Sequence, residues 1–346
     1  MQSLRHPGVH QAWQQWSEDQ TLHITSVYFN PFRSKNRLAT FQAFIDQMQR
    51  TANVVLHIVE VAFGDRPFEV TTEEDVQLRT NDVLWLKENA INLGVAHFPL
   101  GWKYGGYVDG DLSFTRQDWA LEAIHQLQLY SWVQLFSGYG FLSHEHRPLT
   151  LRPSFAYAYH NYFGGTQEQH NEESGPHSGY HQPPGPNKPH KFLGAVGGAW
   201  SFTNKAFEAV GGMLDFCILG AADWYMAFGL IGGNCGNHIE MANCKEAYIT
   251  DIVKWQEKAY KAIKGNISYI DSFVTHNWHG DVSQRGYDDR WQILTKFDFN
   301  PAIDIVKDRQ GLIRWAGNKH KLESAVKRYF ISRNEDNPNA KFQPLY

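Results

Sequence analysis

Apolar and polar positions follow two patterns in the first third of the chain, and these patterns predict strands and helices in turn. The runs HITSVYF at 23–29 and NVVLHIVEVAF at 53–63 are rich in β-branched and aromatic residues, which favours buried strands. Between them, LATFQAFIDQM at 38–48 has the apolar spacing of an amphipathic helix. A helical run at 82–95 and the strand-like YGGYVDGD at 104–111 follow. Strands that alternate with helices predict an α/β fold with a mostly parallel central sheet.

The middle of the chain changes character twice. WALEAIHQLQLYSWVQLFS at 119–137 predicts a helix that runs into a strand, and the glycine-punctuated stretch at 192–233 predicts a strand, a helix, a turn and a second helix. The segment 164–191 is rich in Gly, Pro, His and polar residues, which predicts a flexible loop that could close over a site. Its histidines are irregularly spaced, which does not favour a metal site: His170, His177, His181 and His190.

Composition narrows the class of protein without deciding its function. A hydrophobic content of 42% and a charged content of 20% are those of a globular protein with a large core. The net charge of -4 excludes a polycationic surface, so nucleic acid could be bound only through a local patch. Three cysteines without paired spacing do not indicate a disulfide framework or a zinc knuckle. The sequence has no apolar run of membrane-spanning length and no signal-peptide core, so we expect a cytoplasmic protein without integral membrane contact.

Acidic residues directly follow the strand predicted at 104–108. Asp109 and Asp111 are separated by one glycine, and two like charges this close are costly to bury unless a cation lies between them. Carboxylates are preferred ligands of Mg²⁺ and Mn²⁺. His276 and His279, three residues apart in THNWHG, could supply imidazole ligands to the same ion. The plain alternatives are a solvated surface turn for the acids and aromatic packing for the histidines.

Two further stretches carry candidate chemistry. Arg33 and Arg37 in PFRSKNR stand between a strand and a helix, where backbone N–H groups favour anions and arginine binds phosphate through two bonds. A solvated helix face is the alternative. Asp223 in LGAADWYM follows small residues at the head of an apolar helix, where it could cap the helix or act as a general base.

Five strings, in the same order over about 24–295, resemble the β-1,4-galactosyltransferase group of GT-A-type glycosyltransferases. NPFRSKNR resembles the Pro-Phe-Arg nucleotide loop of that group, and YVDGD resembles its metal-binding Asp-x-Asp. The other three strings are WLKENAINLGV, GGAWSFTNKAFEAVGGM and HNWHG…QRGYDDR. The resemblance implies a GT-A, Rossmann-like fold in three parts: an N-terminal extension over 1–22, a catalytic domain over 23–300 and a C-terminal helical tail over 301–346.

The resemblance also implies roles for individual residues. Asp223 would be the base that deprotonates the acceptor hydroxyl, in a reaction that inverts the anomeric centre. The metal, Mn²⁺ or Mg²⁺, would be held by Asp109, Asp111, His276 and His279, with His276 in the place of the group's methionine. The donor, a nucleotide-diphosphate sugar with UDP favoured, would contact Pro31, Phe32, Arg33, Arg37, Lys87, Asn89, Asp109 and Gly198.

Departures from the group's pattern leave the acceptor open. Ala222 stands where an acceptor-contacting glutamate is expected, and the flanking tryptophan is absent. The acceptor could be a glycan or lipid-linked precursor, a protein, or a hydroxylated base in nucleic acid. Basic residues near the C-terminus favour a phosphate-rich acceptor or a solvated helix face: Arg314, Lys319, Lys321, Lys327, Arg328 and Arg333. Two other classes are considered, a metal-dependent nucleotide-sugar hydrolase or nucleotidyltransferase, and a non-catalytic sugar-nucleotide-binding module.

Overall fold

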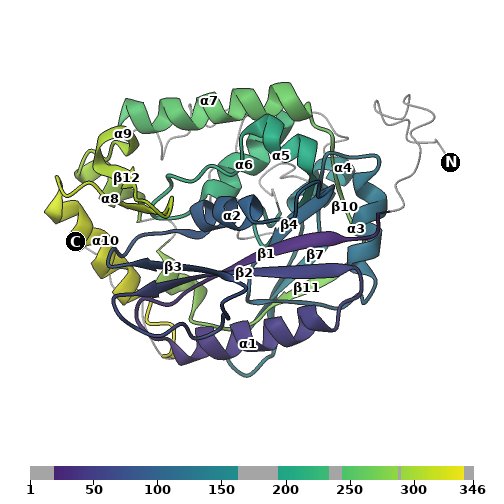
Figure 1. The fold of residues 1–346 in the computed structure, drawn as a ribbon, viewed down its shortest axis with the longest axis horizontal. Coiled ribbons are helices and arrows are strands. Elements are labelled where there is room, and N and C mark those ends of the chain that lie inside the picture. The colour runs from purple at the N-terminus through teal and green to yellow at the C-terminus, as the bar shows by residue number, and fades with distance from the viewer. Residues whose placement is uncertain (1–18, 163–193, 234–243, 287–289, 339–346) are drawn as a thin grey trace, which may run out of the picture.

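The computed structural model describes residues 19–162, 194–233, 244–286 and 290–338. The central sheet has seven strands in the order β10-β6-β9-β4-β1-β2-β3 (Figure 1). Its strands are β1 (Leu22–Phe29), β2 (Val54–Phe63), β3 (Val76–Thr80), β4 (Tyr104–Val108), β6 (Trp132–Gln134), β9 (Ala199–Thr203) and β10 (Ile267–Tyr269). All neighbours pair in parallel except β9, which runs antiparallel to both β4 and β6.

Helices cover both faces of this sheet, so the molecule has three layers (Figure 1). On one face, α1 (Lys35–Gln49) and α3 (Trp119–Leu127) pack in one hydrophobic cluster. The other face carries α2 (Lys87–Ala96), α4 (Phe155–Tyr162), α5 (Asn204–Val210), α6 (Ala222–Ile231) and α7 (Glu246–Ile263). In α1 the buried residues Phe41, Phe44 and Met48 recur at helical spacing, and the Ser34 side chain caps the first turn by accepting from the Arg37 N–H. The expected α/β class, with a mostly parallel sheet between helices, is confirmed.

The predicted elements of the first third are present, with two corrections. Residues 82–86 precede α2 and are not helical, so the observed helix begins at Lys87, five residues later than predicted. Strand β3 pairs in parallel with β2 and was not predicted: VQLRT alternates apolar and polar residues, but over only five positions. The predicted strands and helices at 119–137 and 192–233 are also confirmed, as α3, β6, β9, α5 and α6. The predicted flexible loop at 164–191, with its four histidines, lies outside the described residues.

A second sheet, unexpected from the sequence, has the order β5-β11-β7-β8. Its strands are β5 (Leu112–Phe114), β7 (Gly138–Leu142), β8 (Pro148–Pro153) and β11 (Phe273–His276). Three residues separate the end of β4 from the start of β5, so the turn that contains Asp109 and Asp111 links the two sheets. Strand β11 pairs antiparallel with β5 and sets His276 opposite Leu112. This register determines the position of the site.

The C-terminal part wraps along one edge of the molecule (Figure 1). It contains a short 3₁₀ helix (Val282–Arg285), then α8 (Trp291–Lys296), α9 (Pro301–Asp304), the antiparallel pair β12 (Ile305–Lys307) and β13 (Ile313–Trp315), and α10 (His320–Ser332). Leu322, Val326 and Tyr329 of α10 are buried in the same hydrophobic cluster as α2 and α6. The division into three parts remains a prediction. Among the described residues, no helix combines the length and apolar character needed to cross a membrane.

Candidate active site

A cavity of about 210 Å³ lies at the carboxyl ends of β1 and β4 and is lined by residues of both sheets. Ligands of parallel α/β sheets bind beyond the carboxyl ends of the strands, so this is the expected place for a site. Most of the residues singled out in the sequence line it: Arg37, Lys87, Asp109, Asp111, Gly198, Asp223, His276 and His279. Tertiary folding therefore gathers residues from six separate stretches of sequence around one cavity.

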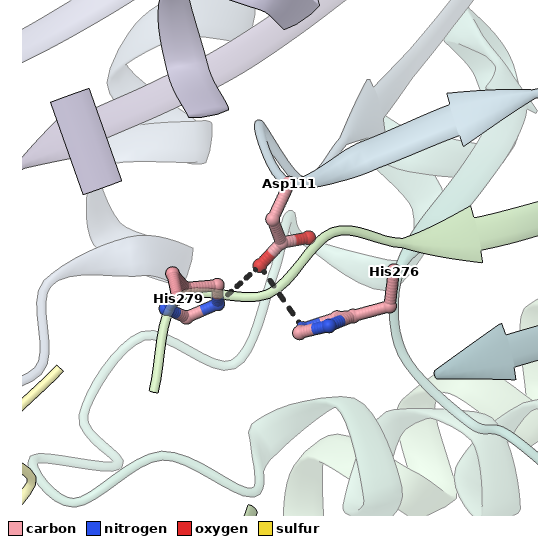
Figure 2. Close-up of side chains that lie close together, drawn as sticks. All are labelled: Asp111, His276 and His279. Carbon is pink, nitrogen blue, oxygen red and sulfur yellow. Dashed lines mark hydrogen bonds and ion pairs between the residues drawn. The ribbon is translucent and has the colours of Figure 1, made fainter. Parts of the chain in front are cut away.

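Three of these residues form a cluster with the geometry of a metal site. One ligand atom each from Asp111, His276 and His279 lies within 4.8 Å of the others. Because β5 pairs with β11, Asp111 stands beside His276, and His279 follows in the next loop. The Nε2 atoms of His276 and His279 lie 3.3 Å and 2.9 Å from Asp111 Oδ2. Figure 2 shows the two rings approaching the carboxylate from different sides.

The chemistry of this donor set fits a divalent cation. Both imidazoles are buried, and burial lowers the pKa of His276 to about 4, so this ring is neutral at pH 7 and can offer a lone pair. Asp111 Oδ1 is buried and has no hydrogen-bond partner among the described residues. One carboxylate and two imidazoles suit Mn²⁺ and related first-row metals better than Mg²⁺, which prefers oxygen ligands.

Asp109 lies outside this three-residue cluster because its carboxylate is bound to Lys87. Lys87 Nζ is 2.8 Å from Oδ1 and 2.9 Å from Oδ2, and it lies over the ring of Tyr107. Burial raises the pKa of Asp109 to about 6, although Lys87 acts to lower it. Burial opposes the charge on Lys87, but Asp109 holds the pKa of Lys87 well above its ordinary value. A role for Asp109 as a metal ligand therefore remains a prediction, whereas its ion pair with Lys87 is present.

Asp223 enters the cavity from the first turn of α6. The N-cap position is Ala221, in the left-handed conformation with φ 72°, so Asp223 is not the N-cap but a first-turn acid, and its Oδ1 accepts the N–H of Trp224 at 2.9 Å. A Cβ atom at Gly197 would overlap Asp223 Oδ2, so the absence of a side chain at 197 makes room for the carboxylate. The neighbouring Gly198, with φ 94°, accepts the N–H of Asp109 at 2.7 Å. Gly197 thus makes room for Asp223, and the backbone of Gly198 holds the turn that contains Asp109.

The β1–α1 loop lies next to the cavity, over a second hollow of about 170 Å³ lined by Pro31, Phe32 and Arg37. Phe32 is 41% exposed, and Arg33 has a positive φ of 56°. Arg37 lines both hollows, but its guanidinium donates to both oxygens of Glu335 at 2.8 Å and 2.6 Å. The predicted anion-binding arginine thus already holds a carboxylate of the chain.

Asn89 has a different environment from the one predicted. It is buried in α2, donates to the carbonyl of Gly311 at 3.2 Å and accepts the N–H of Ile313 at 3.0 Å. These bonds attach α2 to the β12–β13 ribbon. The side chain therefore joins two elements of the fold, and its contact with a donor remains a prediction.

Comparisons with known proteins gave matches only among solved structures. No family profile matches the chain, and no curated protein matches it. A mutant of Drosophila β1,4-galactosyltransferase 7, in complex with manganese, UDP-Gal and xylobiose, is 11% identical, with a TM-score of 0.36 over 87% of this chain and 97% of that chain. The catalytic domain of the same Drosophila enzyme with xylobiose is 10% identical, with a TM-score of 0.34 over 87% of this chain and 97% of that chain. A provisionally named nucleotide-diphospho-sugar transferase from Desulfovibrio desulfuricans is 9% identical, with a TM-score of 0.33 over 90% of this chain and 98% of that chain. Similarities of this size do not assign a family.

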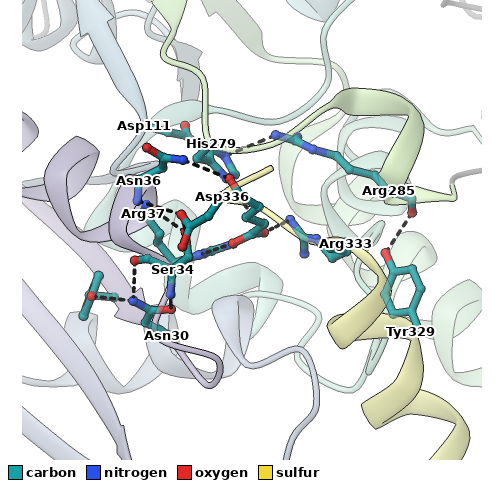
Figure 3. Close-up of polar contacts among 12 residues, drawn as sticks. Asn30, Ser34, Asn36, Arg37, Asp111, His279, Arg285, Tyr329, Arg333 and Asp336 are labelled. Atoms are coloured by element: carbon teal, nitrogen blue, oxygen red, sulfur yellow. Dashed lines mark hydrogen bonds and ion pairs between the residues drawn. The ribbon is translucent and has the colours of Figure 1, made fainter. Parts of the chain in front are cut away.

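Residues near the C-terminus complete the surroundings of the site, and the sequence did not indicate them. Asp336 accepts from the Ser34 hydroxyl at 2.8 Å and from the N–H groups of Lys35 and Asn36 at 2.9 and 3.0 Å (Figure 3). Glu335 pairs with Arg37 and with Arg333, and its Oε1 lies 3.8 Å from His279 Nδ1. The N-terminus of α1, predicted as an anion site, is therefore bound by a carboxylate of the chain itself. These partners are about 300 residues apart, so no local pattern could have revealed them.

Glu88 is a second residue that the sequence did not single out. Its side chain is buried under the cavity and accepts from Trp85 Nε1 at 2.8 Å. Burial raises the pKa of Glu88 to about 7, and Asp223 and Asp109 act in the same direction. The folded state therefore disfavours the ionised form, so the protein loses stability as the pH rises from about 4.5 to 7.

We expect Glu88→Gln to stabilise the protein at pH 8 but hardly at pH 5, because glutamine keeps an acceptor for Trp85 without the buried charge. The gain at pH 8 is roughly 3 kcal/mol in the free energy of unfolding, from the difference between the two pKa values. Urea denaturation of both proteins at pH 5 and pH 8 measures it. An equal gain at both pH values would show that the raised pKa is not its source.

Proposed function

We propose that this chain is a metal-dependent glycosyltransferase that moves a sugar from a nucleotide-diphosphate sugar, with UDP as the favoured nucleotide, to an acceptor hydroxyl. The observation that carries the proposal is the Asp111, His276 and His279 cluster, in one cavity with Asp223 at the carboxyl ends of the strands. The resemblance of the sequence motifs supports the same reading, since each falls at this cavity or beside it.

Asp111, His276 and His279 would hold the metal, Mn²⁺ in preference to Mg²⁺ because two of the three ligands are imidazoles. When bound, the metal would neutralise the negative charge that develops on the diphosphate as the nucleotide leaves. The buried surroundings of both histidines keep their rings fixed and dry, which strengthens electrostatic interactions in the cavity.

Asp223 would act as the general base. A carboxylate that lines the cavity can take the proton of an acceptor hydroxyl and so raise the nucleophilicity of its oxygen. Attack from the side opposite the leaving nucleotide is a single displacement, and it would invert the anomeric centre. The absence of a side chain at Gly197 leaves room for the carboxylate in this position.

The donor would lie between the β1–α1 loop and the metal cluster. Lys87 reaches the cavity wall with its charge maintained by Asp109, and we propose that it faces the diphosphate. The exposed ring of Phe32 is suited to stack on the nucleotide base, with Pro31 and Arg33 shaping the loop. Gly198 would allow the donor to approach β9 closely.

A thermal-shift series tests this function. The purified chain is measured with UDP-, GDP- and CMP-sugars, each with Mn²⁺, Mg²⁺ or EDTA. Because a ligand that binds the native state raises the melting temperature, we expect a rise with a UDP-sugar and Mn²⁺ that EDTA removes. Release of UDP without an acceptor would favour the hydrolase alternative. No shift with any sugar nucleotide, with or without metal, would rule out the transferase.

A further inference from the structure

Arg285 projects from the end of the 3₁₀ helix (Val282–Arg285) into the metal cluster. Its Nη2 lies 3.1 Å from His276 Nε2 and 3.1 Å from His279 Nε2. One nitrogen atom with two hydrogens thus contacts both imidazoles, in the region where Asp111 Oδ2 also lies 2.9 Å from His279 Nε2. Figure 3 shows the long side chain of Arg285 reaching toward His279.

The chemistry of these contacts identifies which lone pairs Arg285 uses. A guanidinium group has N–H donors and no acceptor, so it bonds to each Nε2 through the lone pair of the ring, whereas a bond from Nε2 to the Asp111 carboxylate uses a proton on that same atom. These lone pairs are the ones that a metal ion would need from the two rings. Arg285 and a metal therefore compete for the same two atoms, and both provide positive charge beside Asp111.

The backbone of Arg285 is held while its side chain is long enough to move. Tyr329 Oη of α10 donates to the Arg285 carbonyl at 2.9 Å, and Gly286 ends the 3₁₀ helix with φ 52° (Figure 3). Lys87 is paired with Asp109, and Arg37 and Arg333 are paired with Glu335. Among these four cations of the cavity, Arg285 is the one whose guanidinium contacts both His276 and His279.

We propose that Arg285 is a placeholder for the metal: its guanidinium holds the two histidines when no metal is bound, and metal binding releases it to bind the anionic donor in the same cavity. The inference rests on the proposed function and assigns a role to a residue that neither coordinates metal nor acts as the base. Because the backbone stays tied to Tyr329, the released guanidinium remains at the cavity wall. Metal binding would therefore prepare the cavity for the donor.

The test measures Mn²⁺ and UDP affinity separately. Free Mn²⁺ is followed by electron paramagnetic resonance in titrations of the full chain without nucleotide, for wild type, Arg285→Met and Arg285→Lys. We expect Arg285→Met to bind Mn²⁺ roughly tenfold more tightly, because no competitor then reduces the fraction of metal-competent sites. Arg285→Lys keeps the charge but has a different donor geometry, and should lie between the two. At saturating Mn²⁺, Arg285→Met should bind UDP more weakly than wild type.

A matched control separates competition at the imidazoles from simple charge repulsion. Arg152 lines the same cavity with its guanidinium 5.2 Å from the centre of the Phe141 ring. Arg152→Met removes one positive charge from the cavity and should tighten Mn²⁺ binding less than Arg285→Met does. Circular dichroism confirms that each variant is folded, and Arg285→Lys, which removes less of the side chain, provides the comparison if Arg285→Met is unstable.

Arg285→Met is expected to bind Mn²⁺ more tightly and UDP more weakly. A purely structural role for Arg285 would instead weaken the binding of both ligands. Equal Mn²⁺ affinity in wild type, Arg285→Met and Arg152→Met, or weaker Mn²⁺ binding in Arg285→Met, would overturn the inference. If Mn²⁺ still binds and a UDP-sugar still raises the melting temperature in those cases, the proposed function stands. If no variant binds Mn²⁺, the metal site fails and the inference fails with it.

Discussion

Asp111→Asn is expected to abolish Mn²⁺-dependent binding of the sugar nucleotide and to lower the transfer rate by roughly a thousandfold or more. The carboxylate is the one anionic group of the three-residue cluster, and its Oδ2 lies within 3.3 Å of both Nε2 atoms. Asparagine keeps the size of the side chain but removes the charge that attracts the cation. Loss of several kcal/mol of charge stabilisation in the transition state corresponds to about three powers of ten in rate.

Mn²⁺ titration by calorimetry and transfer assays with a UDP-sugar measure this effect. Asp109→Asn is the matched control, because it changes the neighbouring acid of the same turn, whose carboxylate is bound to Lys87. We expect Asp109→Asn to retain Mn²⁺ binding in the absence of nucleotide. If Asp111→Asn bound Mn²⁺ as tightly as wild type, the metal would have to lie elsewhere.

Asp223→Asn is expected to lower the transfer rate about 10²- to 10⁴-fold while leaving donor and Mn²⁺ binding nearly unchanged. General bases contribute rate factors of this size, and the substitution removes the basic group without changing the shape of the side chain. Asp223 lies in the first turn of α6, outside the metal cluster, so the metal ligands should keep their positions.

The contrast with Asp111→Asn makes the second prediction specific. Both variants lose transfer, but Asp223→Asn should keep the rise in melting temperature with UDP-sugar and Mn²⁺. Gly197→Ala adds a Cβ that overlaps Asp223 Oδ2, so it should displace the carboxylate and lower the rate without removing the acid. Full activity of Asp223→Asn would exclude this residue as the base.

The local pattern of the sequence was sufficient for the long elements of the central sheet. Strands β1 and β2 are 8 and 10 residues long and rich in β-branched and aromatic residues, and α1 has helical apolar spacing, so each can be recognised without tertiary contacts. The second sheet was missed because its strands are only 3 to 6 residues long, and such runs are too short to show a period. Their structure depends on pairing with distant partners.

Some residues of the site were also predictable from the sequence, and others were not. Asp111, His276 and His279 could be singled out because each stands in a short string with metal-binding chemistry. The resemblance added Asp223, whose own string favoured a cap, and the structure places it in the first turn of α6 and on the cavity. Glu88, Arg285, Glu335 and Asp336 carry no such local signal, because a charged residue in a helix or near a chain end is ordinarily solvated.

By itself, the sequence of this protein determined the alternation of strands and helices, the acidic turn after β4 and the pair of histidines. Only the tertiary structure decided that β5 pairs with β11, which sets Asp111 beside His276, and that Asp109 is held by Lys87. It also decided that Arg285 contacts both imidazoles and that Arg37 forms an ion pair with Glu335. The physical reason is that hydrophobic periodicity is a property of neighbouring residues, whereas strand register and buried ion pairs join residues that are distant in the sequence: Lys87 and Asp109 are 22 positions apart, and Arg37 and Glu335 are 298 apart.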